Sequence, residues 1–498
     1  MCLIERREEL DLAREVDVVV VGGGNAGFCA ALAAAERGRS VVLLEKGQEE
    51  SAGGNSFYTA GATRISHEGL NDLLDIVVDD ERHDRTDVPS YLKEQYASDL
   101  AKVTGGRNDP VLTEVLVDES AAGVRWLTSH GIRYRLMYER QAYERADGSY
   151  LFWGGLHIGN VNGGRGLMAD HARAAQRLGV DVRLGNAVLD IRLRDGVVDG
   201  VLVEGRTEGY FLHAESVVIA SGGFEANSEM RRTHLGDGWE NAKVRGTPLN
   251  TGEMLEVAIR LGAARGGDWG TCHSVAWDAW HPGNESNRQL TNRLTRQSYP
   301  LGIVVNLDGR RFLDEGADFR NYTYAKYGRE ILAQPGSVAF QIFDAQTRSQ
   351  LRPEEYDMPG VSVLEARTLE ELARKAQITP DTFLETVREF NEAIDALVPL
   401  DPNVLDGRAS HVDPPKSNWA TSISRPPYFA YPVTCGITFT FGGLRGDVNG
   451  RVLNLAGAAI PGLFAAGEAL GGLFSGNYPG GTGLAAGIVF GRRAGSIA

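Results

Sequence analysis

The chain has 498 residues, of which 42% are hydrophobic and 23% charged, enough to bury a large core over two or three domains. The formal net charge of −15 argues against nucleic acid as a partner, and it means that an anionic substrate would need a local cluster of arginines. The cysteines, at Cys2, Cys29, Cys272 and Cys435, stand far apart, which excludes a CxxC motif and indicates reduced thiols in the cytoplasm.

The N-terminus does not resemble a targeting sequence. The segment MCLIERREEL is charged and lacks the apolar core of a signal peptide. No segment approaches the roughly 20 apolar residues that a membrane span needs. We therefore expect a cytoplasmic protein, with a peripheral association at the inner face of the membrane as an alternative.

The first predicted elements form a βαβ unit. Residues 17–21 are an apolar run typical of a buried parallel strand, followed by glycines and an Ala-rich helix that ends at Gly38. A second strand occupies 41–45. Further along, two strands within 182–204 flank a turn at Asp195-Gly196, and an apolar strand, SVVIA, runs into Ser221.

The stretch from about 274 to 412 follows a different pattern. It is richer in charge and contains two amphipathic helices, TLEELARKA and DTFLETVREFNEAID, joined by a turn at Thr379-Pro380. The Pro-rich segment from Pro414 to Pro432 is typical of a linker, and strand-like sequence returns at 462–470. The predicted fold class is α/β: a Rossmann-like domain over 1–273 and 413–498, split by an inserted α+β capping domain over 274–412.

Glycines directly after the first strand carry the clearest chemical signal. Gly22, Gly24 and Gly27 fit G-x-G-x-x-G between a strand and a helix. The first permits a tight turn, the second a close approach of backbone to a pyrophosphate, and the third close helix–strand packing. Glu45 ends the second strand and can accept hydrogen bonds from a ribose hydroxyl. In this context the pattern predicts a bound dinucleotide.

Other glycine clusters favour FAD over a nicotinamide cofactor. One lies at 51–56, one ends the strand before Ser221-Gly222, and one ends a strand near the C-terminus at Gly467-Glu468. A last cluster at 480–483 opens a small-residue helix whose N-terminus would stabilise an anionic reduced flavin. The residues predicted to bind the cofactor are Gly22, Gly24, Asn25, Ala26, Gly27, Glu45, Lys46, Gly53, Gly54, Asn55, Ser56, Ala60, Gly61, Val188, Ser221, Gly222, Gly467, Glu468, Gly483 and Leu484.

Together these motifs resemble the flavoprotein family of fumarate reductases and succinate dehydrogenases. The resemblance covers nearly the whole chain: the N-terminal fingerprint, GGNS at 53–56, SGGF at 221–224, RF-x-DE at 311–315, and AAGE at 465–468 with the final glycine helix. It implies a GR2-type FAD-binding domain split by a mobile cap, with the active site between them. Within the family, NRLTRQSYPLGIVVN, GRRFLDEGADFRNYTYAK and GGLFSGNYPGGTGL look most like the tricarballylate dehydrogenases, which oxidise tricarballylate to cis-aconitate.

The resemblance also implies a mechanism. Hydride moves between a substrate carbon and flavin N5, while a cap arginine exchanges a proton with the neighbouring carbon. Arg320 matches that arginine, although the spacing differs slightly, so Arg310 and Arg311 stay as alternatives. Because a guanidinium is effectively always protonated, its proton must pass through a relay, for which Glu315 and Asp318 are candidates.

Two positions depart from the fumarate reductase pattern. Tyr478 replaces the arginine of G-x-N-R-x-G-G, and Phe439 replaces the histidine of His-Thr-x-Gly-Gly. Both changes argue against a fumarate or succinate pocket. Tyr478 beside Pro-Gly-Gly is also similar to the 3-ketosteroid dehydrogenases, in which a tyrosine hydroxyl polarises a ketone. A ketosteroid desaturase is therefore one alternative, and a reductase of an unsaturated acid is another.

The cap arginines favour a polyanionic substrate. Arg296 could hold a carboxylate bidentately, with His273 as a further pocket residue. A surface ion pair is the alternative for Arg296, and a core position is the alternative for His273. We predict Arg320, Tyr478, His273 and Arg296 as catalytic residues of a dehydrogenase that forms a C=C bond in a small polycarboxylate.

Cofactor attachment and partners follow from what the motifs lack. No histidine lies in the GGNS region, where family members with covalent flavin carry theirs, so we expect non-covalent FAD. The sequence has no metal-ligand spacing and no haem or iron–sulfur motif, so electrons must leave through another molecule. The resemblance implies a separate membrane-associated electron-transfer protein. A non-catalytic flavoprotein, such as a redox sensor, is the alternative from another class.

Overall fold

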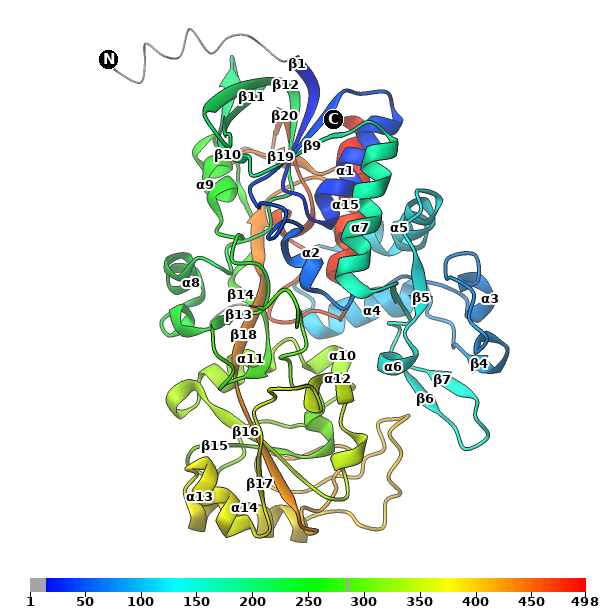
Figure 1. Ribbon diagram of the computed structural model, residues 1–498, viewed down its shortest axis with the longest axis vertical. Helices are drawn as coiled ribbons and strands as arrows, with labels where there is room; N and C mark the ends of the chain where they lie inside the picture. The colour runs from blue at the N-terminus through cyan, green and yellow to red at the C-terminus, as the bar shows by residue number, and fades with distance from the viewer. Residues whose placement is uncertain (1–14, 284–285) are drawn as a thin grey trace. The chain divides into compact units, whose positions relative to one another are not determined.

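The computed structural model describes residues 15–283 and 286–498, so Cys2 lies outside the described residues. The chain divides into two compact units, whose elements are labelled in Figure 1. The first unit comprises the chain up to Gly236, Gly246–Cys272 and Phe439–Ala498. The second unit comprises Asp237–Arg245 and His273–Thr438.

The two units differ from the predicted domain bounds at residues 413–438 and at residues 237–245. Residues 413–438 were assigned to the Rossmann-like domain, but they belong to the second unit. The reason is that β18 (Tyr428–Leu444) pairs with β16 (Ala339–Asp344) from Tyr428 to Val433, so the Pro-rich segment leads into a central strand of that unit instead of linking back. Residues 237–245 join the same sheet through β13 (Lys243–Val244), which also pairs with β18.

The core of the first unit is a parallel sheet in the order β20-β12-β1-β2-β9. Its strands are β1 (Glu15–Val21), β2 (Val41–Glu45), β9 (Asp181–Leu184), β12 (Gly209–Ile219) and β20 (Ala459–Ala465). The apolar runs of β1 and β2 are buried, as the strands of a parallel sheet covered on its faces must be. An antiparallel extension contains β10 (Ala187–Arg194), β11 (Val197–Glu204) and β19 (Arg451–Leu453). The turn at Asp195-Gly196 has positive φ at both residues, and so the predicted hairpin is confirmed.

Three helices lie side by side against this sheet: α1 (Asn25–Glu36), α7 (Gly163–Arg177) and α15 (Thr482–Ile497) (Figure 1). Helices α1 and α15 touch backbone to backbone because α15 has glycines at its contact positions. A Cβ atom at Gly491 would lie 2.5 Å from Ala26 O, and one at Gly495 would lie 2.0 Å from Ala30 O. The small-residue helix predicted near the C-terminus thus packs tightly on the helix that follows the G-x-G-x-x-G loop.

The remaining elements of the first unit lie around this core. They are α2 (Gly54–Tyr58), β3 (Ala62–Thr63), α3 (Leu70–Leu73), β4 (Thr86–Asp87), α4 (Lys93–Thr104), α5 (Pro110–Ser129), β5 (Tyr134–Leu136), α6 (Tyr138–Gln141), β6 (Ala142–Glu144), β7 (Tyr150–Phe152), β8 (Ile158–Asn160), α8 (Ser228–Leu235) and α9 (Glu253–Arg260). Their short strands form the sheets β3-β8-β5 and β4-β7-β6. None of the helices in the described part of the chain is both long and apolar enough to cross a bilayer.

The second unit combines a mixed sheet with short helices. The sheet has the order β13-β18-β16-β15, with β14 and β17 also paired to β18. Its further elements are β14 (Arg265–Asp278), which starts in the first unit, β15 (Ile303–Asn306), α10 (Arg320–Thr323), α11 (Tyr327–Leu332), α12 (Pro353–Tyr356), β17 (Leu364–Ala366), α13 (Leu369–Ala376) and α14 (Pro380–Glu392).

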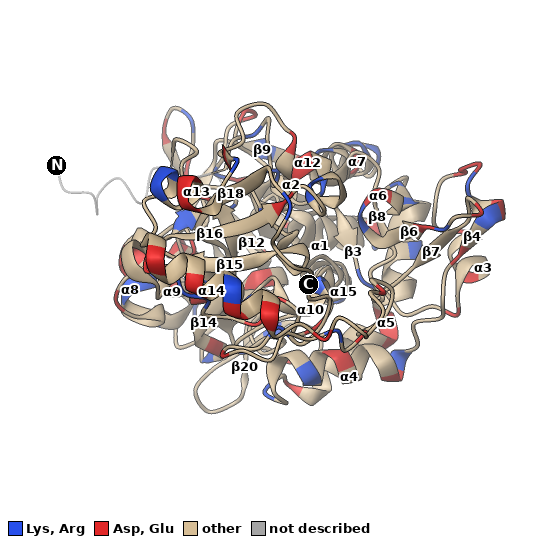
Figure 2. Ribbon diagram, turned by 90° about the horizontal axis from the view of Figure 1, so that it is seen from below, with Lys and Arg blue, Asp and Glu red and all other residues tan. Residues whose placement is uncertain are grey.

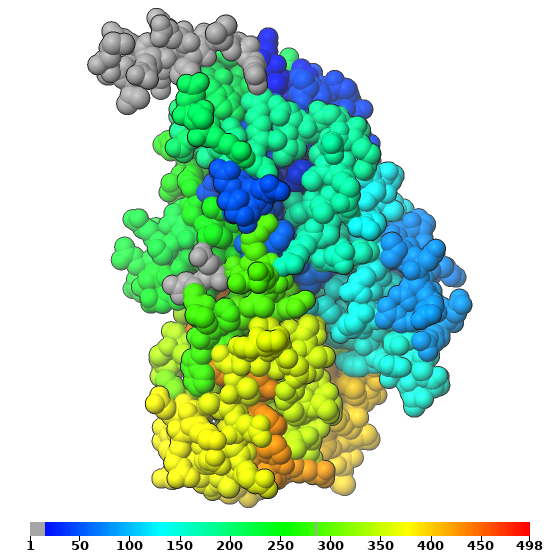
Figure 3. Space-filling view, in the orientation of Figure 1, coloured from blue at the N-terminus to red at the C-terminus, as the bar shows by residue number. Residues whose placement is uncertain are grey.

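Helices α13 and α14 match the predicted amphipathic pair. Thr368 caps α13, because its hydroxyl accepts from Glu371 N at 3.1 Å. Leu372 and Phe383 enter the core of the second unit. The charged positions of both helices, coloured in Figure 2, are mostly exposed. Figure 3 shows the surface formed by this region in yellow. Pro380 is the first residue of α14 and so starts the helix, where it costs no backbone hydrogen bond. The predicted fold class, a Rossmann-like domain with an inserted α+β cap, is confirmed.

Candidate functional site

The predicted cofactor segments meet at one edge of the parallel sheet of the first unit. Val21 pairs with Leu44 and with Ile219, and Ile219 pairs with Ala465, so these strands end in register. Parallel strands present their carboxyl ends at the same edge, where open α/β sheets bind their ligands. The segments that follow the strand ends are 22–27, Glu45-Lys46, Ser221-Gly222 and Gly467-Glu468.

Direct contacts join these segments to two others. The backbone N–H of Asn25 donates to Ser56 Oγ at 2.9 Å, and Asn25 Nδ2 donates to Leu484 O at 3.1 Å. A Cβ atom at Gly467 would lie 2.7 Å from the Cβ of Ala26. The structure therefore brings the loops from 22, 53, 467 and 483 together around the start of α1.

The glycine loop fits the pyrophosphate of a dinucleotide. Gly22 has a φ of 107°, and a Cβ there would lie 2.5 Å from Ala220 O, while a Cβ at Gly27 would lie 1.9 Å from Gly22 O. Gly24 and Gly54 differ, because their Cβ atoms would meet only Ser56 Oγ at 3.5 Å and Gly24 Cα at 3.9 Å. These two glycines border open space. Helix α1 starts there without a side-chain cap of its own, as an anion site at a helix N-terminus requires.

Glu45 and Lys46 have different surroundings. Glu45 is buried, and its carboxylate accepts from Gly23 N at 2.7 Å and from Gly47 N at 2.6 Å. Each carboxylate oxygen has a second lone pair with which a ribose hydroxyl could bond. Lys46 instead directs its ammonium group to Thr251 Oγ1 at 2.7 Å and to Glu253 at 3.1 Å.

The remaining predicted cofactor residues lie in the same unit. Gly53 and Gly61 have positive φ, at 103° and 82°. Gly61, next to Ala60, accepts from Asn160 N at 3.1 Å. Val188 lies on β10, two residues after Asn186, whose N–H donates to Glu45 O at 3.0 Å.

A buried arginine, Arg64, contacts the loop before α15, and the sequence analysis did not single it out. Helix α15 follows Gly481, which has a φ of 83° and no side chain to cap the helix, and Gly483 lies in its first turn. Arg64 is fully buried, and its Nε donates to Gly480 O at 2.9 Å. Its Nη1 lies 3.6 Å from Asp99 Oδ2. The amide groups at this end of α15 carry partial positive charge, as a helix N-terminus does.

Glu468 has an acidic neighbour, Glu225, which the sequence analysis did not single out either. Its Oε1 accepts from Thr440 N at 2.7 Å. Its carboxyl group is hydrogen-bonded to that of Glu225, which follows the SGGF motif directly. Burial raises the pKa of Glu225, and burial together with the charge of Glu225 raises the pKa of Glu468 well above its ordinary value.

Arg320 and His273 belong to the second unit. Arg320 begins α10, is half-buried, and donates from Nη1 to Gln297 Oε1 at 3.4 Å. Its backbone O accepts from Tyr324 N at 3.0 Å. The ring of Tyr324 meets that of His273 edge to face, with centroids 5.1 Å apart.

His273 is buried and uncharged. Burial and the nearby charge of Arg245 hold the pKa of His273 well below its usual range. Arg245 is half-buried and donates from Nη1 to Thr438 Oγ1 at 2.9 Å. Nothing in the local sequence marks Arg245, because it reaches the second unit only through the pairing of β13 with β18.

The structure contradicts the expected role of Arg296. Its guanidinium is fully buried, Nη2 lies 2.6 Å from Asp278 Oδ2, and Nη1 donates to Thr295 O at 2.8 Å. Asp278 is fully buried as well. Arg296 therefore forms an internal ion pair and neither grips a substrate carboxylate nor lies in a surface ion pair.

The two alternatives to Arg320 have different surroundings. Arg311 is buried in an ion pair with Glu315, whose Oε1 also accepts from Val304 N at 2.7 Å. Arg310 is exposed. Among the relay candidates, Glu315 is thus committed to Arg311, which leaves Asp318 as the better candidate.

Tyr478 belongs to an aromatic cluster in the first unit. Its ring centroid lies 5.0 Å from that of Phe439 and 5.4 Å from that of Phe474. Phe441 meets Phe439 at 5.3 Å. Phe439 and Tyr478, the two positions that depart from the fumarate reductase pattern, are therefore in contact with each other.

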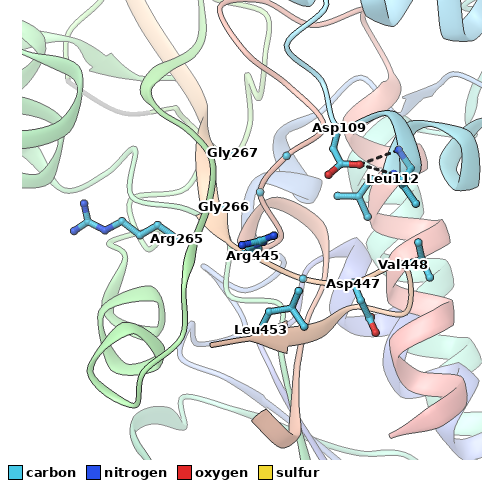
Figure 4. A pocket seen from close by; sticks show the side chains of 13 residues that line it. Asp109, Leu112, Arg265, Gly266, Gly267, Arg445, Asp447, Val448 and Leu453 are labelled. Atoms are coloured by element: carbon cyan, nitrogen blue, oxygen red, sulfur yellow. Dashed lines mark hydrogen bonds between the residues drawn. The ribbon is translucent and has the colours of Figure 1, made fainter. Parts of the chain in front are cut away.

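The first unit also has a surface cavity of about 540 Å³ (Figure 4). No residue predicted to bind cofactor or substrate lines it. Asp109, at its edge, accepts from Val111 N at 2.9 Å and Leu112 N at 3.0 Å and so caps α5. Asp447 accepts from Asn449 N at 2.8 Å within a turn. Both carboxylates have structural roles.

Comparison with known proteins gives a consistent result. A family model described as an FAD binding domain matches residues 17–484. A probable fumarate reductase of Shewanella frigidimarina is 31% identical over 492 residues, which covers 97% of this chain and 74% of the relative. A 3-oxosteroid 1-dehydrogenase of Mycobacterium tuberculosis is 27% identical over 555 residues, covering 94% of this chain and 95% of that protein.

The fold also matches a solved structure. The open conformation of a flavocytochrome c3 fumarate reductase has a TM-score of 0.72 and 28% identity, over 99% of this chain and 79% of that one.

Proposed function

Because this chain belongs to the FAD binding domain family, we propose that it uses FAD to oxidise a carbon–carbon single bond of a small polycarboxylate. It is an FAD-dependent oxidoreductase of the fumarate reductase and 3-ketosteroid dehydrogenase type, acting on carbon–carbon bonds. The substrate that we propose is tricarballylate, with cis-aconitate as the product. When bound, FAD supplies a hydride acceptor at N5 of its ring.

The first unit would hold FAD non-covalently. Backbone N–H groups at the start of α1 would bind the pyrophosphate, and Glu45 would accept from ribose hydroxyls. Glu468 lies beside Gly467, at the same sheet edge, and could accept from other hydroxyl groups of the cofactor. The start of α15 would stabilise negative charge on the ring.

The observation that carries the choice of substrate class is that the second unit holds two half-buried arginines, Arg320 and Arg245, and a buried, neutral histidine. The ring of His273 contacts Tyr324, four residues after Arg320, and the charge of Arg245 acts on the same imidazole. Guanidinium groups bind carboxylates through paired N–H donors, and the neutral imidazole of His273 can add one more donor. We propose Arg245 in place of Arg296 as a carboxylate-binding residue.

Arg320 would also move the proton. As Asp318, two residues earlier, takes a proton from the guanidinium, the guanidinium would take one from the substrate carbon next to the one that loses hydride. Asp318 is mostly buried and accepts from Phe319 N at 2.8 Å, so its carboxylate is oriented. A rapid transfer of this kind is needed because a guanidinium is already fully protonated.

A second candidate rests on the aromatic cluster of the first unit. Phe439, Phe474 and Tyr478 provide apolar rings and one hydroxyl group, which would suit a ketosteroid whose ketone is polarised by the tyrosine. A reductase of an unsaturated acid would use the same arginines in the opposite direction.

Electrons must then leave the protein. We propose a separate membrane-associated electron-transfer protein as acceptor, with this chain in the cytoplasm, because the sequence carries no haem or iron–sulfur motif through which to pass electrons onward.

The test is product identification under turnover. The purified protein would be incubated with tricarballylate and an artificial electron acceptor, and in parallel with a 3-ketosteroid. The proposal predicts cis-aconitate, detected by mass spectrometry, and no change in the steroid. A dehydrogenated steroid without cis-aconitate would replace the proposal with the second candidate.

A further inference from the structure

We propose that Glu225 is a positioning residue for FAD: it shares one proton with Glu468 and thereby connects the turn at Gly467 to the loop that carries Asn55. This inference rests on the cofactor site of the first unit and does not depend on which substrate the protein oxidises.

The two oxygens of Glu225 have unequal surroundings. Glu225 is fully buried, and its Oε1 accepts from Asn55 Nδ2 at 2.6 Å and from Asn250 Nδ2 at 2.7 Å. Its Oε2 is buried too, and among the described residues no amide, hydroxyl or cationic group donates to it. A proton between this oxygen and a second acceptor would stabilise it.

Glu468 provides that second acceptor. Its Oε1 accepts from Thr440 N at 2.7 Å and from Thr440 Oγ1 at 3.1 Å, and its carboxyl group bonds to that of Glu225. Two touching carboxyl groups in a buried place cannot both be charged, so the pair retains one proton. Gly223 permits the approach, because a Cβ there would lie 2.2 Å from Glu468 Oε1.

The pair lies where cofactor loops converge. Asn55, held by Glu225, also accepts from Thr247 N at 2.9 Å and belongs to the loop whose Ser56 binds the start of α1. Gly467, next to Glu468, contacts Ala26 of the G-x-G-x-x-G loop. The shared proton therefore joins the loop that carries Asn55 to the turn at Gly467. It also fixes the orientation of the carboxyl group of Glu468, which is half-buried.

Loss of the shared proton should weaken the binding of FAD. The groups that face the pair are the amides of Asn55 and Asn250, Thr440, and Arg231 on α8, whose Nη1 donates to Glu225 O at 2.6 Å. When both carboxyl groups are ionised they repel each other. Because the protonated pair is the form that holds FAD, affinity should be constant at low pH and fall as the pH rises through the raised pKa of the pair.

The experiment measures FAD release from the full-length holoprotein on dilution, by the fluorescence of free flavin, over a series of pH values. For the wild type we expect the Kd to rise with pH, by up to about tenfold per unit while the pair loses its proton. Glu225→Gln keeps an acceptor for Asn55 and Asn250 and offers a permanent N–H donor to Glu468. It should bind within about threefold of the wild type at neutral pH and show no pH dependence.

Two further variants complete the design. Glu225→Ala removes the acceptor that Asn55 and Asn250 share, and it should weaken binding by about 10- to 100-fold. Glu229→Gln removes an exposed charge four residues away and should follow the wild-type profile. If Glu225→Ala does not fold, Glu225→Gln still decides. A Glu225→Gln variant with the wild-type pH profile, or a wild type whose Kd does not change with pH, would overturn the proposal.

Discussion

Arg320 is the residue on which the proposed chemistry depends most. It lies in the second unit, whereas the FAD-binding loops belong to the first, so replacing it should leave the yellow cofactor in place. We predict that Arg320→Gln lowers the rate of flavin reduction by tricarballylate by about 100-fold or more, the usual size of an acid–base contribution. Stopped-flow absorbance measures this rate.

Arg310 offers a matched control. It is an exposed arginine of the same unit, so Arg310→Gln should reduce the flavin at close to the wild-type rate. Near-normal reduction in Arg320→Gln would remove Arg320 from the mechanism.

Tyr478 distinguishes the two candidate functions. Its hydroxyl group would polarise a ketone in a steroid desaturase, whereas in a tricarballylate dehydrogenase it would serve mainly as one ring of the cluster with Phe439. We predict that Tyr478→Phe, which keeps the ring, changes kcat/KM for tricarballylate by less than about tenfold. A loss of about 100-fold or more would indicate that the hydroxyl takes part in the chemistry and would favour the steroid reaction.

Asp278 tests the corrected role of Arg296. The ion pair between them is buried on both sides, and Asp278 also accepts from Ser362 N at 3.0 Å. Asp278→Asn leaves the guanidinium charged and uncompensated, so we predict a loss of about 3–5 kcal/mol in the stability of the second unit. Urea unfolding followed by tryptophan fluorescence measures it. An unchanged midpoint with a raised KM would restore Arg296 as a substrate-binding residue.

At the scale of elements, the packing of α1 on α15 decides whether replacing a glycine of α15 with alanine stabilises or destabilises the protein. Alanine is favoured over glycine inside an isolated helix by up to about 1 kcal/mol. In α15, however, a Cβ at Gly491 would lie 2.5 Å from Ala26 O, so the helices would have to separate. We therefore predict that Gly491→Ala destabilises the protein, by about 1–3 kcal/mol, and loosens FAD because Ala26 belongs to the cofactor loop.

Thermal unfolding with and without added FAD is the measurement for this variant. Gly270→Ala is the control, because the nearest atoms to a Cβ there are Asp268 Oδ1 at 3.5 Å and His234 O at 3.8 Å. A stabilised Gly491→Ala would mean that helix propensity outweighs the close contact.

Elements with a strong local signal could be predicted from the sequence. The apolar runs of β1 and β2, the hairpin at Asp195-Gly196 and the helices α13 and α14 all occur as expected, since local pattern and burial agree there. The segment before β18 could not be predicted. Its prolines are typical of a linker, and only its long-range pairing with β16 makes it part of the second unit.

In the candidate site, too, only the parts with a local sequence signal could be predicted. Cofactor loops can be recognised because each glycine cluster follows a strand that ends at one sheet edge. Glu225, Arg64 and Arg245 carry no local motif, and their importance arises only from tertiary neighbours. The prediction that Arg296 binds a substrate carboxylate was wrong for the same reason, because its ion-pair partner Asp278 lies on another element.

At the scale of the whole molecule, the proposed reaction has one requirement in each unit: the first unit binds the FAD that accepts the hydride, and the second unit carries Arg320, which moves the proton. The proposed turnover therefore needs both units. A test must therefore use the complete holoprotein and must follow the cofactor itself rather than a downstream acceptor.

The most direct measurement is anaerobic mixing of the oxidised protein with tricarballylate, and separately with a 3-ketosteroid, while the absorbance of oxidised flavin is followed. We predict that tricarballylate bleaches the flavin in a single turnover and that the steroid does not. Bleaching by the steroid alone would overturn the proposed function and make Tyr478 the central residue. If tricarballylate does not bleach the flavin, it is not the substrate.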